Sequence, residues 1–394
     1  MIYLDNSATT RQYDEVTDLI YDLSKNTWGN PSSLHSLGFE ASNILKQSRK
    51  DIENMFYGNG QVIFTSGGTE ADNMALISTA RKLRRRGNKI ITSRIEHPAV
   101  LETCKRLQEE GFQIEYLDCD VDGYVEPQTV KAVLDKNTIM VSLMTVNNEV
   151  GTIESVLPAF RFVTEFNKSN GTNILFHTDA VQAFGKIRFG DIPFDLISAS
   201  GHKIHGPKGV GFLYMRKDLK LPAFITGGGQ EDGYRSTTEN LQGIAGLALA
   251  SKMAYTNFDD KMHHIADVNE YLRKGLGAEL SDLMLNGPSE LGYTLFDSGK
   301  RCPSVLNISF LGTRGEVLLH TLEQDGIFVS TGSACSSHHT GDSHVLSAMS
   351  MTHKEIECAI RFSFSEFNTF EEMDYVIDKT KNAVNRLRRL GSFR

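Results

Sequence analysis

The chain has 394 residues, of which 40% are hydrophobic and 23% are charged, and its formal net charge is −8. This length is more than one core usually serves, so one large domain and a smaller one are expected. The acidic balance and the absence of a basic block in the sequence argue against partners such as nucleic acid or an anionic membrane surface. The sequence is that of an ordinary globular protein.

The N-terminal sequence MIYLDNSATT lacks a signal-peptide pattern, and the most apolar helical stretch, around 244–250, is too short to span a bilayer. Five cysteines are scattered along the sequence, and they include no CxxC pair. Their number and spacing therefore predict neither a disulfide scaffold nor a cysteine-rich zinc site. We expect a cytoplasmic protein without a metal site.

The middle of the chain alternates β-rich segments with helical patterns. The strand candidates are residues 61–66, 89–93, 112–118, 138–146, 173–179, 194–200 and 210–215. This alternation predicts an α/β fold with a mostly parallel, doubly wound sheet. Ligands bind such sheets at the carboxyl ends of the strands, so residues just beyond strand ends are the first candidates for a site.

A second, smaller α+β domain is predicted from a long amphipathic helix near 256–275 onward. The later strand candidates are 304–312, 326–331 and 358–365, and the helix candidates are 315–324, 353–358 and 370–389. We expect the first residues to pack beside this part. The predicted division is a large domain of residues 14–256 and a small domain of residues 1–13 and 257–394.

The segment FTSGGTEADN leaves the first strand candidate, turns at Gly67 and Gly68 and enters a helix near Thr69. Backbone N–H groups and the positive end of the helix dipole at such a turn suit a phosphate group. A simple tight turn is the alternative.

Three polar side chains follow the next strand ends. Asp179 ends a strand candidate, and Gln182 lies three residues on; a buried carboxylate there needs a cationic partner, although a helix cap is the alternative. His97 follows the strand candidate at 89–93, where an imidazole could lie on an aromatic cofactor, or simply start a helix.

The segment SGHKIHGPKGVG places Lys203 in a glycine-rich turn. A solvated surface loop is one interpretation. A phosphate loop is disfavoured, because Pro207 follows Gly206 where a lysine is needed. The third interpretation is a lysine that forms a Schiff base with an aldehyde cofactor. Since Asp179 lies one strand earlier at the same rim, the pair suits pyridoxal 5′-phosphate, with the phosphate on the glycine turn and Ser200.

The segment STGSACSSHHTGDS surrounds Cys335 with small polar residues that cannot pack a core. A thiol on such a loop is a candidate nucleophile, and an incidental exposed cysteine is the alternative. His338 and His339 could favour the thiolate or simply be solvated.

Taken together, these segments resemble the cysteine desulfurases of the NifS and IscS branch, within the class V aminotransferase group of pyridoxal phosphate enzymes. The resemblance is carried, in the family's order, by YLDNSATT, GNPSSLH, FTSGGTEADN, EHPAVLETC, VNNEVG, DAVQAFGK, SGHKIHGPKGVG, GGGQEDGYRSTTEN, STGSACSS and IRFSF. It covers the chain nearly end to end and implies the type I fold of pyridoxal phosphate-dependent transferases.

The resemblance also implies roles. Lys203 holds the cofactor, Asp179 pairs with the pyridine nitrogen, Gln182 with the ring hydroxyl, and His97 stacks on the ring. The phosphate is held by Gly68, Thr69, Ser200 and His202, and by Thr238 of the neighbouring subunit, which implies a homodimer. Asn148 and Arg361 orient the carboxylate of L-cysteine, and Asn148 also lies against the cofactor. Cys335 takes the sulfur as a persulfide, L-alanine is released, and an acceptor protein receives the sulfur.

The sequence departs from the family's pattern next to one of these residues. RSTTEN has Thr237 where the family prefers glycine, directly before Thr238. The sulfur could serve iron–sulfur cluster assembly, tRNA thiolation or another use. The alternative activities are a selenocysteine lyase or another class V aminotransferase-like enzyme, and a non-catalytic thiol carrier on the same fold is a third interpretation.

Overall fold

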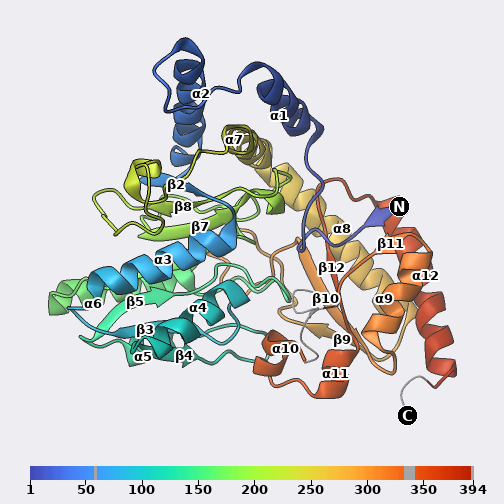
Figure 1. The fold of residues 1–394 in the computed structure, drawn as a ribbon. Helices are drawn as coiled ribbons and strands as arrows, with labels where there is room; N and C mark the ends of the chain where they lie inside the picture. The colour runs from blue at the N-terminus through green and yellow to red at the C-terminus, as the bar shows by residue number, and fades with distance from the viewer. Residues whose placement is uncertain (57–59, 332–341, 392–394) are drawn as a thin grey trace.

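The computed structural model describes residues 1–56, 60–331 and 342–391. Two sheets and their helices lie side by side, the larger formed by the middle of the chain and the smaller by its last third (Figure 1). No helix in the described ranges is both long and apolar enough to cross a membrane.

The large sheet has seven strands in the order β2-β8-β7-β6-β5-β3-β4. Its strands are β2 (Gln61–Thr65), β3 (Lys89–Ser93), β4 (Gln113–Leu117), β5 (Thr138–Ser142), β6 (Leu175–Asp179), β7 (Leu196–Ser200) and β8 (Gly211–Met215). Neighbours from β4 to β7 pair in parallel, whereas β8 runs antiparallel to both β7 and β2. The predicted mostly parallel sheet is therefore confirmed, and the carboxyl ends of β2, β3, β5, β6 and β7 lie along one edge.

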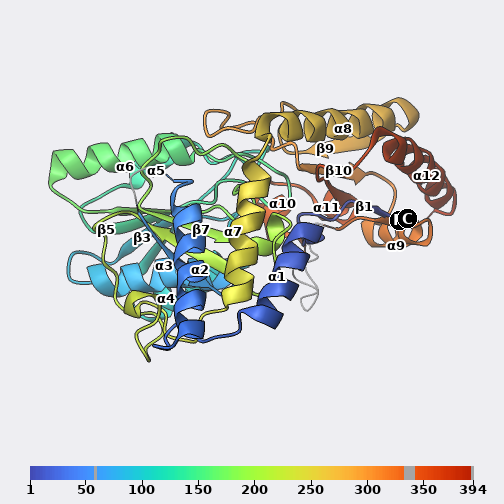
Figure 2. The same cartoon turned by 90° about the horizontal axis from the view of Figure 1, so that it is seen from above.

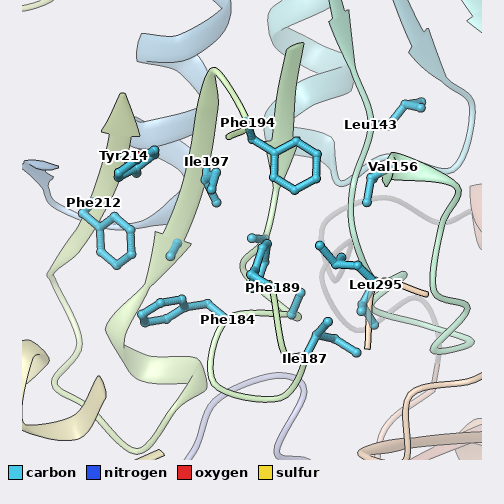
Figure 3. Close-up of a cluster of buried hydrophobic side chains, with 14 of the residues drawn as sticks. Leu143, Val156, Phe184, Ile187, Phe189, Phe194, Ile197, Phe212, Tyr214 and Leu295 are labelled. Atoms are coloured by element: carbon cyan, nitrogen blue, oxygen red, sulfur yellow. The ribbon is translucent and has the colours of Figure 1, made fainter. Parts of the chain in front are cut away.

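Helices cover both faces of this sheet, because side chains alternate between the faces along each strand. On β2, Ile63 packs toward α3 and α4, while Val62 and Phe64 join the core on the opposite face. Figure 3 shows part of that second core, where Ile197 and Phe212 of neighbouring strands lie near Phe184. The helices of this part are α1 (Asp14–Asn26), α2 (Ser36–Glu53), α3 (Gly68–Leu83), α4 (Pro98–Glu109), α5 (Pro127–Val133), α6 (Val156–Asn170) and α7 (Leu241–Tyr255), with short 3-10 turns η1 (Gly201–Lys203) and η2 (Glu231–Gly233).

The smaller part is built on the antiparallel sheet β12-β10-β9, and β1 pairs in parallel with β11 beside it. Its strands are β1 (Ile2–Tyr3), β9 (Leu283–Asn286), β10 (Val305–Phe310), β11 (Ile327–Phe328) and β12 (Ala359–Ser363). Its helices are α8 (Phe258–Glu279), α9 (Gly315–Gln324), α10 (His344–Ala348), α11 (His353–Glu357) and α12 (Phe370–Arg389). The expected long helix near 256–275 is α8, and the strand expected at 326–331 is only the two residues of β11.

A separate hydrophobic core joins this smaller part. Its buried members are Ile2 and Leu4, together with residues between Phe258 and Leu387. The first strand of the chain thus packs with the last third of the sequence. The division into residues 14–256 on one side and 1–13 with 257–394 on the other stays a prediction, and this core is in line with it.

Candidate active site

A cavity of about 230 Å³ opens at the edge where the parallel strands end. It is lined by Ser7, Ala8, Gly68, Thr69, Asp72, His97, Met144, Val146, Asn148, Asp179, Val181, Gln182, Ser200, His202, Lys203 and Arg361. Most of the residues singled out in the sequence lie in this set. Most of them follow strands of the large sheet, whose shared edge brings them together. Ser7 and Ala8 come from the N-terminal segment instead, and Arg361 comes from β12 of the smaller sheet.

Lys203 lies in the turn η1 directly after β7, and its side chain lines the cavity. Its Nζ donates hydrogen bonds to the carbonyl oxygens of Ser7, at 2.6 Å, and Ala8, at 2.8 Å. The turn packs tightly against itself, since a Cβ atom on Gly206 would lie 2.8 Å from the carbonyl oxygen of Gly201. The glycines therefore allow a compact turn that presents the lysine to the cavity, which excludes the interpretation as a solvated loop.

Asp179 is the last residue of β6 and is buried in the cavity wall. Its Oδ1 accepts a hydrogen bond from the backbone N–H of Val181 at 2.8 Å, so it caps the following turn and also faces the cavity. Burial raises the pKa of Asp179 to about 6, while the hydrogen bond from Val181 and the charge of Lys203 act in the opposite direction. A cation in the cavity would restore the carboxylate.

His97 is the N-cap residue of α4, and its Nδ1 accepts a hydrogen bond from the backbone N–H of Ala99 at 3.1 Å. Both interpretations made from the sequence thus apply to one residue, because the capping imidazole also lines the cavity. Burial, together with the charges of Lys203 and His344, lowers the pKa of His97 to about 4. The ring is therefore neutral near pH 7, and its proton is on Nε2 because Nδ1 accepts.

The glycine turn between β2 and α3 forms one end of the site. A second cavity adjoins the first there and shares Gly68, Thr69, Ser200 and His202 with it. Lys208, which the sequence reasoning did not single out, also lines this second cavity. Backbone N–H groups of a helix start and a nearby lysine make this end suitable for an anion.

Asn148 and Arg361 lie at the cavity wall next to the smaller sheet. Arg361 belongs to β12, and its guanidinium donates to the carbonyl oxygen of Asn148 at 2.9 Å and to Asp5 at 3.0 Å. Its Nε is buried and has no hydrogen-bond partner among the residues that the structure describes. Asn148 therefore contributes its backbone to the position of the arginine, whose side chain lines the cavity.

Two predicted site residues are not placed in this cavity. Thr238 is exposed and lines neither of the two adjoining cavities. Cys335, with His338 and His339, lies outside the described residues.

Sequence reasoning missed two features of the cavity. Ser7 and Ala8 provide the carbonyl groups that contact Lys203, although the sequence predicted only that the N-terminal segment packs beside the small domain. Asp72 of α3 also lines the cavity, and burial together with the neighbouring Asp179 raises its pKa. The available signal was the position of Asp72, a carboxyl group about one helical turn after Gly68 at the start of α3.

The fold and this site define an α/β enzyme of the type I transferase fold, with a lysine and a buried carboxyl group at the edge of the parallel strands. Comparisons with known proteins agree. Residues 2–376 match the family described as aminotransferase class-V. A protein of Dictyoglomus turgidum named cysteine desulfurase IscS is 38% identical over an alignment of 396 positions, which covers 100% of this chain and 97% of that protein.

Solved structures give the same result. One described as a NIFS-like protein has a TM-score of 0.88 and 36% identity, and covers 98% of this chain and 99% of its own. Another, described as SspA in complex with cysteine, has a TM-score of 0.79 and 29% identity, and covers 94% of this chain and 100% of its own. The chain belongs to the class-V aminotransferase family and, within it, to the cysteine desulfurases.

Proposed function

We propose that this protein removes sulfur from L-cysteine with pyridoxal 5′-phosphate as its cofactor, releases L-alanine, and holds the sulfur on Cys335 before passing it to an acceptor protein. One observation carries the proposal: Lys203 and Asp179, which are 24 residues apart, line the same cavity. The relative described as SspA in complex with cysteine supports L-cysteine as the substrate.

The chemistry of the cavity fits the cofactor. Asp179 is a buried carboxyl group whose pKa burial raises, so a protonated ring nitrogen beside it would replace a missing counter-charge. Gly68, Thr69, Ser200 and His202 surround the adjoining cavity, which suits the phosphate. When bound, pyridoxal phosphate supplies an electron sink next to the substrate's Cα, which weakens the bond between Cβ and sulfur.

The side chains divide the remaining work. Lys203 Nζ is the group that anchors the cofactor and then moves a proton at the Cα of the substrate. His97 lies against the ring as a neutral imidazole that can donate from Nε2. The guanidinium of Arg361, which lines the cavity, takes the substrate carboxylate, for which its planar shape is suited, and Asn148 assists on the same side.

Cys335 is proposed as the nucleophile. Its thiolate attacks the sulfur of L-cysteine, the bond between Cβ and sulfur breaks, and a persulfide forms on the enzyme while the carbon skeleton leaves as alanine. The electron pair of the broken bond stays on Cβ, and the thiol proton of the substrate is transferred there, which completes the methyl group of alanine. No external oxidant or reductant is needed.

A homodimer is the proposed assembly, as the resemblance implies. An exposed apolar surface of α1, α2 and their connection supports it, and we call this the α1–α2 surface. It consists of Tyr21, Trp28, Leu34, Leu37 and Phe39. In Figures 1 and 2 these two helices project from the rim of the large sheet beside α7.

A reducing compartment, proposed to be the cytoplasm, suits the unpaired state of Cys104, Cys119, Cys302 and Cys358.

Incubation with L-cysteine tests the activity. We expect sulfide, released in the presence of a thiol reductant, and alanine in equal amounts, and Lys203→Ala should lose both products together with the cofactor's visible absorbance. Formation of a 2-oxo acid without sulfide would instead indicate an aminotransferase, and turnover of selenocysteine alone would indicate a selenocysteine lyase.

The role of Cys335 has a separate test. Cys335→Ala should keep the bound cofactor but lose at least about a thousandfold in sulfide release, because the carbon chemistry and the sulfur transfer are assigned to different residues. Cys119→Ala is the matched control, since Cys119 is a partly exposed cysteine remote from the cavity lining. Unchanged sulfide release by Cys335→Ala would overturn the assignment.

A further inference from the structure

Gln182 has two hydrogen-bond partners that fix the orientation of its side-chain amide. Its Nε2 donates to the carbonyl oxygen of Ser7 at 2.9 Å, and its Oε1 accepts from Nζ of Lys186 at 3.0 Å. A peptide carbonyl only accepts and an ammonium group only donates, so one orientation of the amide satisfies both. Nε2 carries a second hydrogen, which this orientation leaves for the cavity that Gln182 lines.

Lys186 does not line the active-site cavity. It follows Gly185, whose φ of 77° lets the chain reverse there, and it lines another small cavity of about 40 Å³, to which Lys203 also contributes. Burial lowers the pKa of Lys186 to about 8. Burying an ammonium group is costly for stability, and a methionine or leucine could fill the same space without that cost.

The carbonyl of Ser7 joins this lysine to the other one. Ser7 O accepts from Gln182 Nε2 and from Lys203 Nζ, so Lys186, Gln182, Ser7 and Lys203 form a continuous chain of hydrogen bonds. If the amide of Gln182 turned over, its oxygen would face the carbonyl of Ser7 and its nitrogen would face the ammonium of Lys186. Lys186 and Ser7 together therefore fix the orientation of the Gln182 amide, and with it the direction of the hydrogen bonds along this chain.

We propose that Lys186 is a positioning residue that holds the Gln182 amide with its nitrogen toward the active-site cavity, where it donates to the ring hydroxyl oxygen of pyridoxal phosphate. This inference rests on the proposed function, because it takes the cavity to be the cofactor site. It adds a residue that does not itself line that cavity.

A double-mutant cycle tests the proposal through cofactor binding by the apo-protein. Lys186→Met should weaken the affinity for pyridoxal phosphate by about tenfold or more, since the donor to the ring oxygen is no longer held in place. In the background Gln182→Ala, the same substitution should cause no further loss, because the effect of Lys186 passes through Gln182. Lys261→Met is the matched control: Lys261 lines the same small cavity but pairs with Glu366 at 3.0 Å.

Other outcomes would overturn the inference. An equal loss of affinity on Lys186→Met with and without Gln182, or the same loss on Lys261→Met, would give Lys186 only a structural role. Should Lys186→Met fail to fold, Lys186→Leu also removes the hydrogen-bond donor, and it must show the same dependence on Gln182. If the wild-type apo-protein does not bind pyridoxal phosphate, the proposed function fails first, and this result is distinct from the others.

Discussion

At the scale of single residues, Glu96 is a buried titratable group directly before His97 of the site. It has no exposed surface, and its Oε1 accepts hydrogen bonds from the Ser93 hydroxyl at 2.7 Å and the backbone N–H of Met144 at 3.0 Å. Burial nevertheless raises its pKa from 4.5 to about 8. The folded state thus holds a proton that the unfolded chain has lost, so this group's contribution to stability decreases as the pH rises from 4.5 to about 8.

Glu96→Gln, a neutral mimic of the protonated group, should remove this dependence. We expect the free energy of unfolding of the variant, relative to wild type, to increase by about 1 kcal/mol or more between pH 5 and pH 8. Denaturant unfolding at several pH values measures it. The control is Glu109→Gln on the exposed side of α4, which should leave the pH dependence as it is. If the difference in the free energy of unfolding between Glu96→Gln and wild type does not change with pH, the raised pKa of Glu96 is contradicted.

Residues near strand ends were the part of the site that the sequence could predict. Gly68, His97, Asp179 and Lys203 all lie at or just beyond the carboxyl ends of strands that run in the same direction, so their meeting at one edge follows from topology alone. Ser7 could not be placed in this way, because its contact with Lys203 joins positions 196 apart through a loop without periodicity. Nor could the sequence show that His97 both caps α4 and faces the cavity.

At the scale of elements, the first residue of α3 controls how closely that helix approaches the site. A Cβ atom on Gly68 would lie 2.5 Å from Cγ2 of Val181, in the turn that follows β6. Gly68→Ala should therefore push the start of α3 away from Val181 and weaken the affinity for pyridoxal phosphate by about tenfold. The affinity for pyridoxal, which lacks the phosphate, should change much less.

Titration of the apo-protein with both compounds measures the two affinities. Gly277→Ala is the control: this glycine lies within α8, and a Cβ atom added there would meet no described atom within 4 Å. The change should therefore stabilise the helix by about 0.5–1 kcal/mol without affecting cofactor binding. Equal losses for pyridoxal and pyridoxal phosphate on Gly68→Ala would contradict a phosphate site at α3.

Pattern reasoning worked better for some elements than for others. The helices α9 and α12 and most strands of the large sheet follow strong periodicity or β-branched runs, and their ranges match the expected ones closely. The exception is β5, which ends at Ser142, four residues before the end of the strand expected at 138–146. The direction of β8 was not predictable, because a strand with both faces buried has a nearly continuous apolar sequence whether it runs parallel or antiparallel to its neighbours. The expected strand at 326–331 ends after Phe328, where the pairing with the two-residue β1 also ends.

At the scale of the whole molecule, the N-terminal segment connects the two parts of the fold. Ile2 and Leu4 belong to the core of the smaller part, Ser7 and Ala8 contact Lys203, and α1 packs against α7 on the larger part. A movement of one part relative to the other would thus act directly on the carbonyl groups around Lys203. No short stretch of the sequence encodes this arrangement, since it depends on the relative placement of both cores.

The α1–α2 surface gives the prediction that belongs to this scale. Trp28 is 67% exposed and Leu34 is fully exposed, and burying such side chains between two copies contributes about 1.5–3 kcal/mol each. The double substitution Trp28→Glu and Leu34→Glu should therefore convert the proposed dimer to a monomer at micromolar concentration, as measured by analytical ultracentrifugation. The control is Phe296→Glu, at an apolar residue that is 73% exposed outside this surface, which should leave the mass unchanged.

Cofactor affinity distinguishes a dimer in which Thr238 reaches the phosphate site of the neighbouring copy from a dimer formed in another way. Thr238 is exposed and lines neither cavity of its own chain, so its proposed contact with the phosphate requires a second copy. The monomeric variant should therefore bind pyridoxal phosphate less tightly than wild type, and Thr238→Ala should lose affinity while remaining a dimer. Full affinity in the monomeric variant would mean that one chain completes the phosphate site by itself, because no neighbouring threonine could then reach it.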